Sequence, residues 1–341
     1  MKIAVVLFNL GGPDSPEAVE PFLRNLFSDP AIISLPLVFR KPLAWFIAKR
    51  RAPIAKDIYA MIGGRSPIVE ETEAQAGALE RQLEAQGFDA RCFIAMRCWK
   101  PFSDDAVVKV KAWGAEKIVL LPLYPQFSTT TTRSSLDDWD RAAHKAGLSS
   151  DSARICCYPD ESGFIAAVAA LIMDAFAKRK PDVDYRLLLS AHGLPKRTVG
   201  AGDPYQWQVE KTASAIVERL GTSNLDYQVC YQSRVGPLEW IAPATDVEIR
   251  RAGAESKGVI VAPVAFVSEH SETLVELDIE YAHLANSTGV PDYIRVSTVG
   301  TQENFVRGLA RLVIEAAQAG GTVNGCGARI CPRDRSKCIY A

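Results

Sequence analysis

Short apolar segments alternate with longer amphipathic segments along almost the whole chain. Amphipathic stretches such as 67–87 and 204–219 predict helices between the apolar segments. Strands that alternate with helices form parallel sheets with helical crossovers. The pattern therefore predicts an α/β protein of two lobes, each with a parallel sheet of about four strands flanked by helices. The eight segments that we expect to form the strands are 3–9, 91–97, 117–124, 154–158, 186–191, 226–232, 258–266 and 293–298.

The length of 341 residues is sufficient for two domains that each bury a core of their own. A polar turn at 147–152 lies near the middle of the chain and marks the expected boundary. We expect an N-terminal lobe over 1–150 that includes an apolar segment at 32–51. A C-terminal lobe over 151–320 and a cysteine-containing tail over 321–341 then follow.

The charge balance and the N-terminus limit the classes of partner and compartment. The 39 lysines and arginines nearly equal the 40 aspartates and glutamates, so no broad basic field is present and nucleic acid is not an expected partner. Residues 1–9 are too short for a signal peptide, and no apolar segment has the length of a membrane span. We expect a cytoplasmic protein whose eight cysteines are thiols or metal ligands rather than disulfides.

A histidine follows one of the predicted strands directly. His192 comes after the apolar run 186–190, and Gly193 and Pro195 turn the chain beyond it. In open α/β sheets, ligands bind at the carboxyl ends of the strands. The imidazole has a pKa near neutrality, so it suits the acceptance of protons at pH 7. His192 is therefore either a proton acceptor at a binding site or a structural histidine bonded to nearby backbone.

A row of acidic residues follows a later predicted strand. Glu269, Glu272, Glu276 and Glu280 recur at spacings of three, four and four, which places them on one face of a helix. Like charges at these spacings destabilise a helix unless water or a cation offsets the repulsion. Two interpretations stay open, a solvated acidic face and a path for a hard cation.

The segment 32–51 is apolar, but prolines and basic residues interrupt it, so it does not cross a bilayer. Lys49, Arg50 and Arg51 edge its C-terminal end. We consider three roles for this segment: a core helix with a solvated basic end, a lid over a flat apolar ligand that carries carboxylates, and a surface that rests on an acidic membrane.

Seven short segments of this chain resemble ferrochelatases, in the same order and over nearly the whole length. They are LFNLGGP at 7–13, KRRAP at 49–53, IGGRSPI at 62–68, LYPQFS at 123–128, SAHGLP at 190–195, YQSRVGPLEW at 231–240 and FVSEHSETLVELDIEY at 266–281. The resemblance implies two similar Rossmann-like lobes with a porphyrin cleft between them. It also implies the insertion of Fe²⁺ into protoporphyrin IX to give protohaem with release of two protons, the last step of haem synthesis.

The resemblance also implies roles for residues at matched positions. His192 matches the histidine that accepts the pyrrole protons or binds iron, and Glu272 matches an acid paired with it across the macrocycle. These two residues are thus the candidate metal ligands. Glu276 and Glu269 match the acids that pass protons or metal onward. The matched substrate-binding residues are Arg51, Tyr59 and Ser66 at the propionates, and Leu10, Tyr124 and Trp240 at the pocket wall. Segment 32–51 matches an apolar lip, which favours the lid and implies a peripheral contact with the cytoplasmic face of the inner membrane.

Three cysteines in the tail predict a metal centre. Cys326, Cys331 and Cys338 lie within a short polar segment and resemble the ligands of the two-iron two-sulfur cluster that some ferrochelatases carry. Thr129 stands where the internal cysteine ligand of that pattern would align. The fourth ligand therefore stays open among the remaining cysteines, which are Cys92, Cys98, Cys156, Cys157 and Cys230.

Three other functions fit parts of the same pattern. A coproporphyrin ferrochelatase and a cobalt chelatase would share the fold and the site. A non-catalytic tetrapyrrole carrier would need the pocket residues but no acids beside His192, so Glu272 and Glu276 argue against it.

Overall fold

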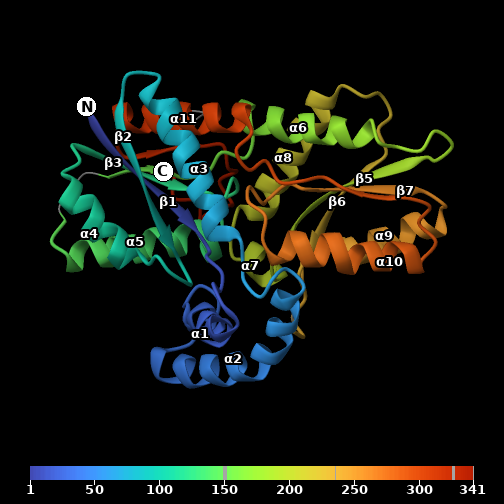
Figure 1. Ribbon diagram of the computed structural model, residues 1–341, viewed down its shortest axis with the longest axis horizontal. Coiled ribbons are helices and arrows are strands. Elements are labelled where there is room, and N and C mark those ends of the chain that lie inside the picture. Colours follow the sequence, from blue (N-terminus) through green and yellow to red (C-terminus); the bar gives the residue numbers. More distant parts are fainter. Residues whose placement is uncertain (149–151, 235, 325–326, 341) are drawn as a thin grey trace. The chain divides into compact units, whose positions relative to one another are not determined.

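The computed structural model describes residues 1–148, 152–234, 236–324 and 327–340. The chain forms two compact units, each built around one sheet (Figure 1). Unit 1 contains the described residues of 1–157 and 309–329 with residue 340, and unit 2 contains 158–308 and 330–339. This division differs from the expected one at 150 and 320, because a strand after residue 151 and the second half of the last helix belong to unit 1.

The sheet of unit 1 has five strands in the order β2-β1-β3-β4-β9, and all of its neighbours pair in parallel. β1 (Lys2–Asn9) lies between β2 and β3, and its residues from Ile3 onward are buried. Burial on both faces explains its continuous apolar run, as is usual in parallel sheets covered by helices. The other strands are β2 (Asp89–Met96), β3 (Lys117–Pro122), β4 (Ser152–Ile155) and β9 (Thr322–Val323).

The sheet of unit 2 has four strands in the order β6-β5-β7-β8, also parallel throughout. Its strands are β5 (Tyr185–His192), β6 (Tyr227–Gln232), β7 (Gly258–Pro263) and β8 (Tyr293–Arg295). The order second, first, third, fourth is the same as that of the first four strands of unit 1. The structure thus confirms the eight predicted strands and the α/β fold with two parallel sheets, and it adds the short strand β9.

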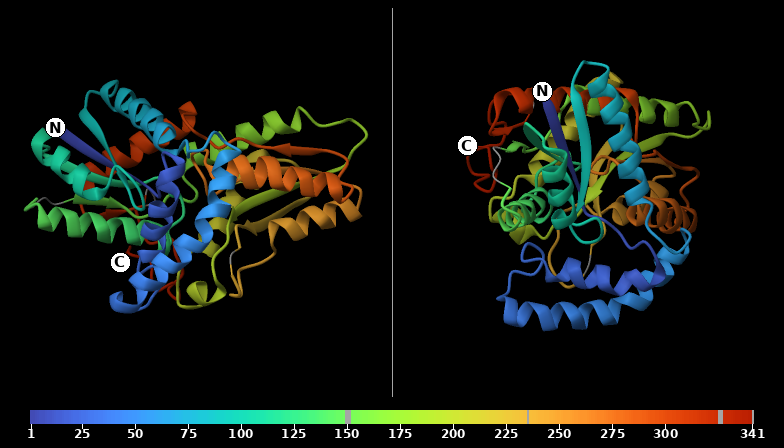
Figure 2. Two further views of the ribbon diagram at one scale, coloured as in Figure 1. Left: turned by 60° about the horizontal axis from the view of Figure 1, so that its bottom comes forward. Right: turned by 60° about the vertical axis from the view of Figure 1, so that its left-hand side comes forward.

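Helices flank both sheets (Figures 1 and 2). The helices of unit 1 are η1 (Pro16–Ala18), α1 (Val19–Ser28), α2 (Leu37–Ala60), α3 (Ile68–Glu84), α4 (Ser103–Trp113), η2 (Thr129–Arg133) and α5 (Ser134–Lys145). The helices of unit 2 are α6 (Ser162–Phe176), α7 (Lys196–Gly200), α8 (Tyr205–Leu220), α9 (Thr245–Ala254), η3 (Glu272–Glu280) and α10 (Tyr281–Ser287). α11 (Glu303–Ala319) begins in unit 2 and ends in unit 1.

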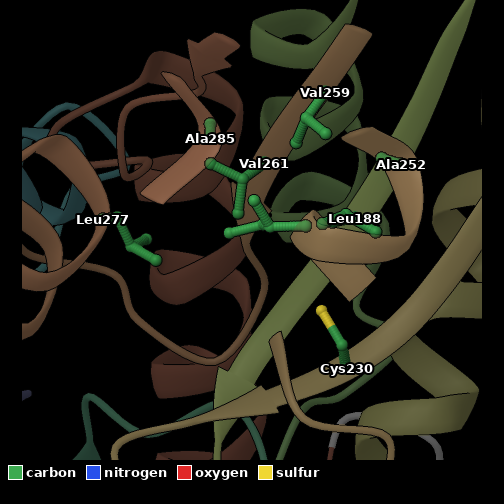
Figure 3. Packing of buried hydrophobic residues seen from close by; sticks show 8 residues of the cluster. Leu188, Cys230, Ala252, Val259, Val261, Leu277 and Ala285 are labelled. Atoms are coloured by element: carbon green, nitrogen blue, oxygen red, sulfur yellow. The ribbon is translucent and has the colours of Figure 1, made fainter. Parts of the chain in front are cut away.

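The core of unit 2 lies between its sheet and the helices that follow β6 and β7. Leu188, Val259 and Val261 from the strands are fully buried and pack with Leu277 of η3 (Figure 3). Side chains at alternate positions of a strand lie on one face, so Val259 and Val261 both contribute to this layer. This packing fixes η3 against the sheet through its apolar side.

The segment expected at 32–51 forms most of α2, which packs against α1 (Figure 2). The small residues Ala48 and Ala52 are buried and pack with residues of α1, and Ala44 is also buried. The large apolar residues of and around this helix are instead exposed, so α2 is not a core helix. These exposed residues are Leu35, Leu37, Val38, Phe39, Leu43, Trp45, Phe46, Ile54 and Met61. None of the helices in the described part of the chain combines the length and the apolar character needed to cross a bilayer.

Candidate active site

The candidate site of unit 2 lies at the carboxyl ends of β5 and β7, which are adjacent central strands. His192 is the last residue of β5, and η3 follows β7. The chain leaves β5 toward β6 on one side and returns with β7 on the other side. This arrangement is the topological switch point at which open α/β sheets bind their ligands. The sequence prediction that His192 stands at the end of a strand is confirmed.

Gly193 allows the chain to pass close to two neighbours directly after His192. Its N–H donates to the carbonyl oxygen of Gln232 over 2.8 Å. A Cβ atom at this position would lie 3.0 Å from that oxygen and 3.2 Å from the ring of Trp240. The absence of a side chain at Gly193 therefore permits the close turn that follows His192.

His192 and Glu272 form a hydrogen-bonded pair. The distance from Nδ1 of His192 to Oε2 of Glu272 is 2.9 Å, and the side chains are 36% and 29% exposed. A neutral imidazole that donates from Nδ1 carries its lone pair on Nε2, so the second ring nitrogen is a proton acceptor. The partly exposed imidazole is thus placed to receive a proton from a bound molecule.

The pair also shifts the pKa values of both groups. Burial lowers the pKa of His192, but the charge of Glu272 and the hydrogen bond to it raise this pKa more, to a value above the ordinary one. Burial raises the pKa of Glu272, and the charge and hydrogen bond of His192 lower it more, to well below its usual range. The carboxylate is therefore ionised at neutral pH and strengthens the imidazole as a base.

Three acids of the row, Glu272, Glu276 and Glu280, lie on a π-helix, whereas Glu269 lies in the loop before it, so the expected single helix face for all four is wrong. η3 is nine residues long, begins at Glu272 and continues into α10. π-Helical turns are rare and are frequently found at functional sites. Glu272 and Glu276 still share one face, but both are partly buried and hydrogen-bonded. Only Glu280 of the row is an exposed carboxylate, so a wholly solvated acidic face is the wrong interpretation.

Glu276 is held by several donors. Its Oε1 accepts from the backbone N–H of Ser233 over 2.8 Å and from the hydroxyl of Tyr281 over 2.9 Å. Its Oε2 accepts from the hydroxyl of Ser233 over 2.5 Å and from the amide of Gln232 over 3.1 Å. Ser233 has a φ of 62°, an uncommon conformation for a residue other than glycine. That conformation directs both donors of Ser233 at Glu276.

Gln232 connects the end of β6 to η3. Its side-chain oxygen accepts from the hydroxyl of Ser190 over 2.8 Å, which orients its amide nitrogen toward η3. The nitrogen donates to the backbone oxygen of Glu272 over 2.9 Å as well as to Glu276. Neither Gln232 nor Ser233 was a sequence-predicted site residue. Their position at the carboxyl end of the strand beside β5, with Gln232 as its last residue and Ser233 directly after it, was the signal that would have found them.

Glu269 is tied to a residue of the edge strand. Its Oε1 accepts from Arg295 over 2.6 Å and from the backbone N–H of Thr298 over 2.9 Å. Burial raises the pKa of Glu269, but Arg295 and the other donors lower it more, to below its ordinary value. Glu269 is thus an ionised partner of Arg295, a residue that sequence reasoning also missed.

The expected arrangement of His192 and Glu272 on two sides of a macrocycle is wrong. Both side chains come from unit 2 and are in direct contact at 2.9 Å. No planar ring fits between two atoms that share a hydrogen bond. The two groups therefore act together from one side.

Trp240 lies near His192, beside the Gly193 turn, and pairs as an isolated bridge with Pro195. The other predicted substrate residues belong to unit 1. Ser66 is buried beside Gly12, and Tyr59 is buried against α1. Arg51 lies 5.9 Å from the ring centre of Phe27.

Leu10 packs against a buried apolar cluster between α1 and α2 that includes Ala52 and Tyr59. Burial raises the pKa of Tyr124, which follows β3. Arg51, Tyr59 and Leu10 thus lie around one group of packed residues at the junction of α1 and α2. Their expected role in binding a substrate stays a prediction.

The tail cysteines are described in part. Cys331 is buried, and its sulfur accepts from the amide of Gln208 over 3.1 Å. Cys338 is partly buried, and Cys326 lies outside the described residues. Within the described ranges, no three histidine, cysteine or acidic side chains gather as a metal site. The described residues therefore do not assemble the ligand set of an iron–sulfur cluster.

Comparison with known proteins identifies the family. The family model described as Ferrochelatase matches residues 2–317. A ferrochelatase of Caulobacter vibrioides (strain NA1000 / CB15N) is 53% identical over 99% of this chain and 97% of its own. A ferrochelatase of Phenylobacterium zucineum (strain HLK1) is 52% identical over 99% and 98%.

Among solved structures, the sirohydrochlorin chelatase SirB from Bacillus subtilis subspecies spizizenii, in complex with cobalt, has a similar fold. The TM-score is 0.54 and the sequence identity is 14%, over 93% of this chain and 96% of that one. At this identity the likeness concerns the fold alone, and it agrees with two parallel sheets flanked by helices. The family model and the full-length relatives together show that the chain belongs to the ferrochelatase family.

Proposed function

We propose that this protein inserts Fe²⁺ into protoporphyrin IX to give protohaem, with release of two protons. Membership of the ferrochelatase family supports the reaction class. The single observation that carries the chemistry is the 2.9 Å hydrogen bond between His192 and Glu272 at the switch point of the sheet. A metal chelatase needs a base of this kind, because two pyrrole N–H protons must leave before the nitrogens bind the metal.

His192 acts as the proton acceptor in this proposal. Its Nδ1–H donates to Glu272, so the lone pair of Nε2 takes the proton of a pyrrole nitrogen. The imidazolium that results is stabilised by the adjacent carboxylate. The proton then passes to solvent along the partly exposed pair, and neutral His192 is restored for the second pyrrole proton. Fe²⁺ replaces the two protons on the macrocycle, so charge balances overall.

Glu276 has a different task from Glu272. Four hydrogen bonds occupy its two oxygens, so it has little free capacity to bind a metal ion or accept a proton. It anchors the end of β6 to η3 and so holds the turn of η3 that follows Glu272. We therefore assign proton transfer to His192 and Glu272 and an anchoring role to Glu276.

The deciding experiment is an anaerobic assay with Fe²⁺ and protoporphyrin IX, performed on the wild type and on His192→Ala. We expect the wild type to form protohaem. The variant should lose about 10²- to 10⁴-fold in kcat and still bind porphyrin, because only the proton acceptor is removed. Coproporphyrin and Co²⁺ serve as alternative substrates in the same assay. A higher kcat/KM with either would assign the chain to the coproporphyrin or cobalt activity instead.

The exposed apolar side of α2 supports a peripheral membrane contact. Phe39, Trp45 and Phe46 are among its exposed large side chains, and Lys49 and Arg50 are exposed beside them. Apolar side chains next to basic ones suit the surface of an acidic bilayer. We propose that the protein is cytoplasmic and binds the inner membrane through this helix.

Sedimentation with vesicles tests the membrane contact. Binding should be stronger to vesicles that contain phosphatidylglycerol than to neutral vesicles, and it should weaken in Phe39→Ser/Phe46→Ser. Met173→Ser, which alters an exposed apolar residue of α6, is the matched control. Equal binding by the wild type and the double variant would exclude α2 as the contact.

A two-iron two-sulfur cluster stays a prediction from Cys326, Cys331 and Cys338. The burial of Cys331 and the hydrogen bond to its sulfur suit a ligand thiolate, because such bonds tune iron–sulfur centres. The absorption spectrum and the acid-labile sulfide of the anaerobically purified protein test it. A colourless, sulfide-free protein would exclude the cluster.

A further inference from the structure

Arg295 of β8 contacts two acidic residues that lie on either side of Glu272 in the sequence. Its Nη1 donates to Oε1 of Glu269 over 2.6 Å. Its Nε and Nη2 donate to the two carboxylate oxygens of Asp278 over 2.7 and 2.6 Å. The arginine side chain is only 14% exposed, so these charge-assisted hydrogen bonds are partly desolvated. One guanidinium thus joins the loop before η3 to the last turn of η3.

A second side chain of the same strand holds the same helix. The hydroxyl of Tyr293 donates to the backbone oxygen of Leu277 over 2.8 Å. Tyr293 and Arg295 are two residues apart on a strand, so they lie on one face of β8. β8 itself pairs with β7, the strand that precedes η3. The edge of the sheet therefore supports η3 from the side that does not carry His192.

External support is needed because η3 is a π-helix of nine residues. Helices of this type are rare and short in proteins, so neighbouring contacts must stabilise the conformation. Arg295 also balances the charges of Glu269 and Asp278, which would otherwise lie near each other uncompensated. Glu272 is the first residue of η3, between those two acids, and its carboxylate meets His192 only if this segment keeps its place.

We propose that Arg295 is a positioning residue for the chelatase reaction and acts by holding Glu272 in contact with His192. The inference rests on the proposed function, because it assigns Arg295 to the proton-accepting pair. It predicts that weakening the contacts of Arg295 lowers kcat and leaves porphyrin binding intact. The guanidinium does not touch the reacting atoms in this proposal.

Arg295→Lys is the first test. Lysine keeps a positive charge but cannot form the bidentate bond to Asp278. We expect kcat to fall about tenfold to a hundredfold, since small displacements of a reacting group have effects of this size. KM for protoporphyrin should change by less than about twofold, because no substrate contact is removed. Wild-type kcat in this variant would overturn the proposal.

Arg186→Lys is the matched control. Arg186 is also buried and also bridges two carboxylates, Asp226 over 2.8 Å and Glu255 over 2.7 Å. It stands near the start of β5, at the opposite end of the strand from His192. This variant should lower the urea midpoint of unfolding as Arg295→Lys does, with kcat unchanged. An equal loss of kcat in both variants would reduce the role of Arg295 to general stability and refute the proposal.

A double-mutant cycle with Glu272→Ala separates positioning from other effects. If Arg295 acts through Glu272, Arg295→Lys should cost no further activity once that carboxylate is gone. The same fold loss in both backgrounds would contradict the proposal. If Arg295→Lys does not fold, Asp278→Asn replaces it as the test. This substitution weakens the hydrogen bonds between Arg295 and residue 278 and keeps the ion pair between Arg295 and Glu269.

Failure of the proposed function can be told apart from failure of this inference. A wild type that forms no haem refutes the function alone. The positioning is then measured through the ¹⁵N chemical shifts of the His192 ring, which report the Nδ1 hydrogen bond. The chain has four histidines, so a His192→Ala spectrum assigns the signal. Arg295→Lys should lose the hydrogen-bonded shift and Arg186→Lys should keep it; an unchanged shift in Arg295→Lys would overturn the inference.

Discussion

Glu272→Gln should weaken the base and change the pH dependence of the reaction. Glutamine has the size of glutamate but no charge, so it keeps the 2.9 Å contact to His192 as a neutral hydrogen bond. A hydrogen bond to a charged group contributes about 1.5–3 kcal/mol and a neutral one about 0.5–1.5 kcal/mol. The substitution therefore removes about 1–1.5 kcal/mol from the imidazolium that forms when His192 accepts a proton. Larger values do not apply, because about a third of each side chain is exposed to screening solvent.

This energy converts directly to a rate. Since about 1.36 kcal/mol corresponds to a factor of ten, kcat on the alkaline plateau should fall about tenfold. The acid limb should also move to lower pH. Neutral His192 is the active form, and Glu272 raises its pKa above the ordinary value of 6.5. Without that charge, burial is the larger remaining influence and lowers the pKa, so activity persists at a lower pH.

The assay is the pH dependence of kcat for haem formation under anaerobic conditions. Glu280→Gln is the control, because Glu280 is an exposed acid of the same helix and no contact to His192 is seen for it among the described residues. It should keep the wild-type profile. An acid limb of Glu272→Gln that stays in place or moves to higher pH would refute the role of Glu272 as the charge partner.

The same pair predicts a pH-dependent contribution to stability. The raised pKa of His192 stabilises the fold fully below the ordinary histidine pKa, and this contribution is lost as pH rises through the raised value. The lowered pKa of Glu272 stabilises the fold above the ordinary carboxylate pKa of 4.5 and is lost as pH falls below it. Between pH 4.5 and the ordinary pKa of histidine, the free energy of unfolding of the wild type should exceed that of Glu272→Gln by about 1 kcal/mol or less. At pH 9 the difference should be smaller. Urea unfolding at pH 5.5 and pH 9 measures the difference, and a larger gap at pH 9 would contradict the assignment.

Three further substitutions test the surroundings of the pair. Gln232→Glu replaces the amide nitrogen that donates to Glu276 with an oxygen. It should lower the free energy of unfolding by about 2–3 kcal/mol in urea titrations. An unchanged midpoint would show that the hydrogen bonds of the Gln232 amide contribute little. Gly193→Ala would place a methyl group 3.0 Å from the backbone oxygen of Gln232. We expect kcat to fall severalfold while the far-ultraviolet circular dichroism stays unchanged; wild-type kcat would mean that the turn adapts. Leu188→Ala opens a cavity in the core of unit 2 and should cost about 2–5 kcal/mol of unfolding free energy, with KM unchanged; a cost below about 1 kcal/mol would mean that the core collapses around it.

Patterns in the amino-acid sequence were sufficient to predict the class of fold and the strand ends that carry chemistry. The eight predicted segments became eight parallel strands, and the signal was strongest for β1, β5 and β7, because burial on both faces of a parallel strand requires a continuous apolar run. His192 was found for the same reason, since the last residue of such a run lies at the carboxyl end of its strand. Short motifs spread over the chain also indicated the family correctly.

The way in which the site residues combine became known from the folded chain alone. Spacing predicted Glu269, Glu272 and Glu276 on one helix face, but Glu269 lies in the loop before η3. Spacing also could not show the partners of these acids, because the partners lie on β5, β6 and β8, far away in the sequence. For the same reason, the expectation that His192 and Glu272 face each other across a ring was wrong. Local patterns specify which face of an element a residue occupies; the partner that it meets there depends on which strands the sheet brings together.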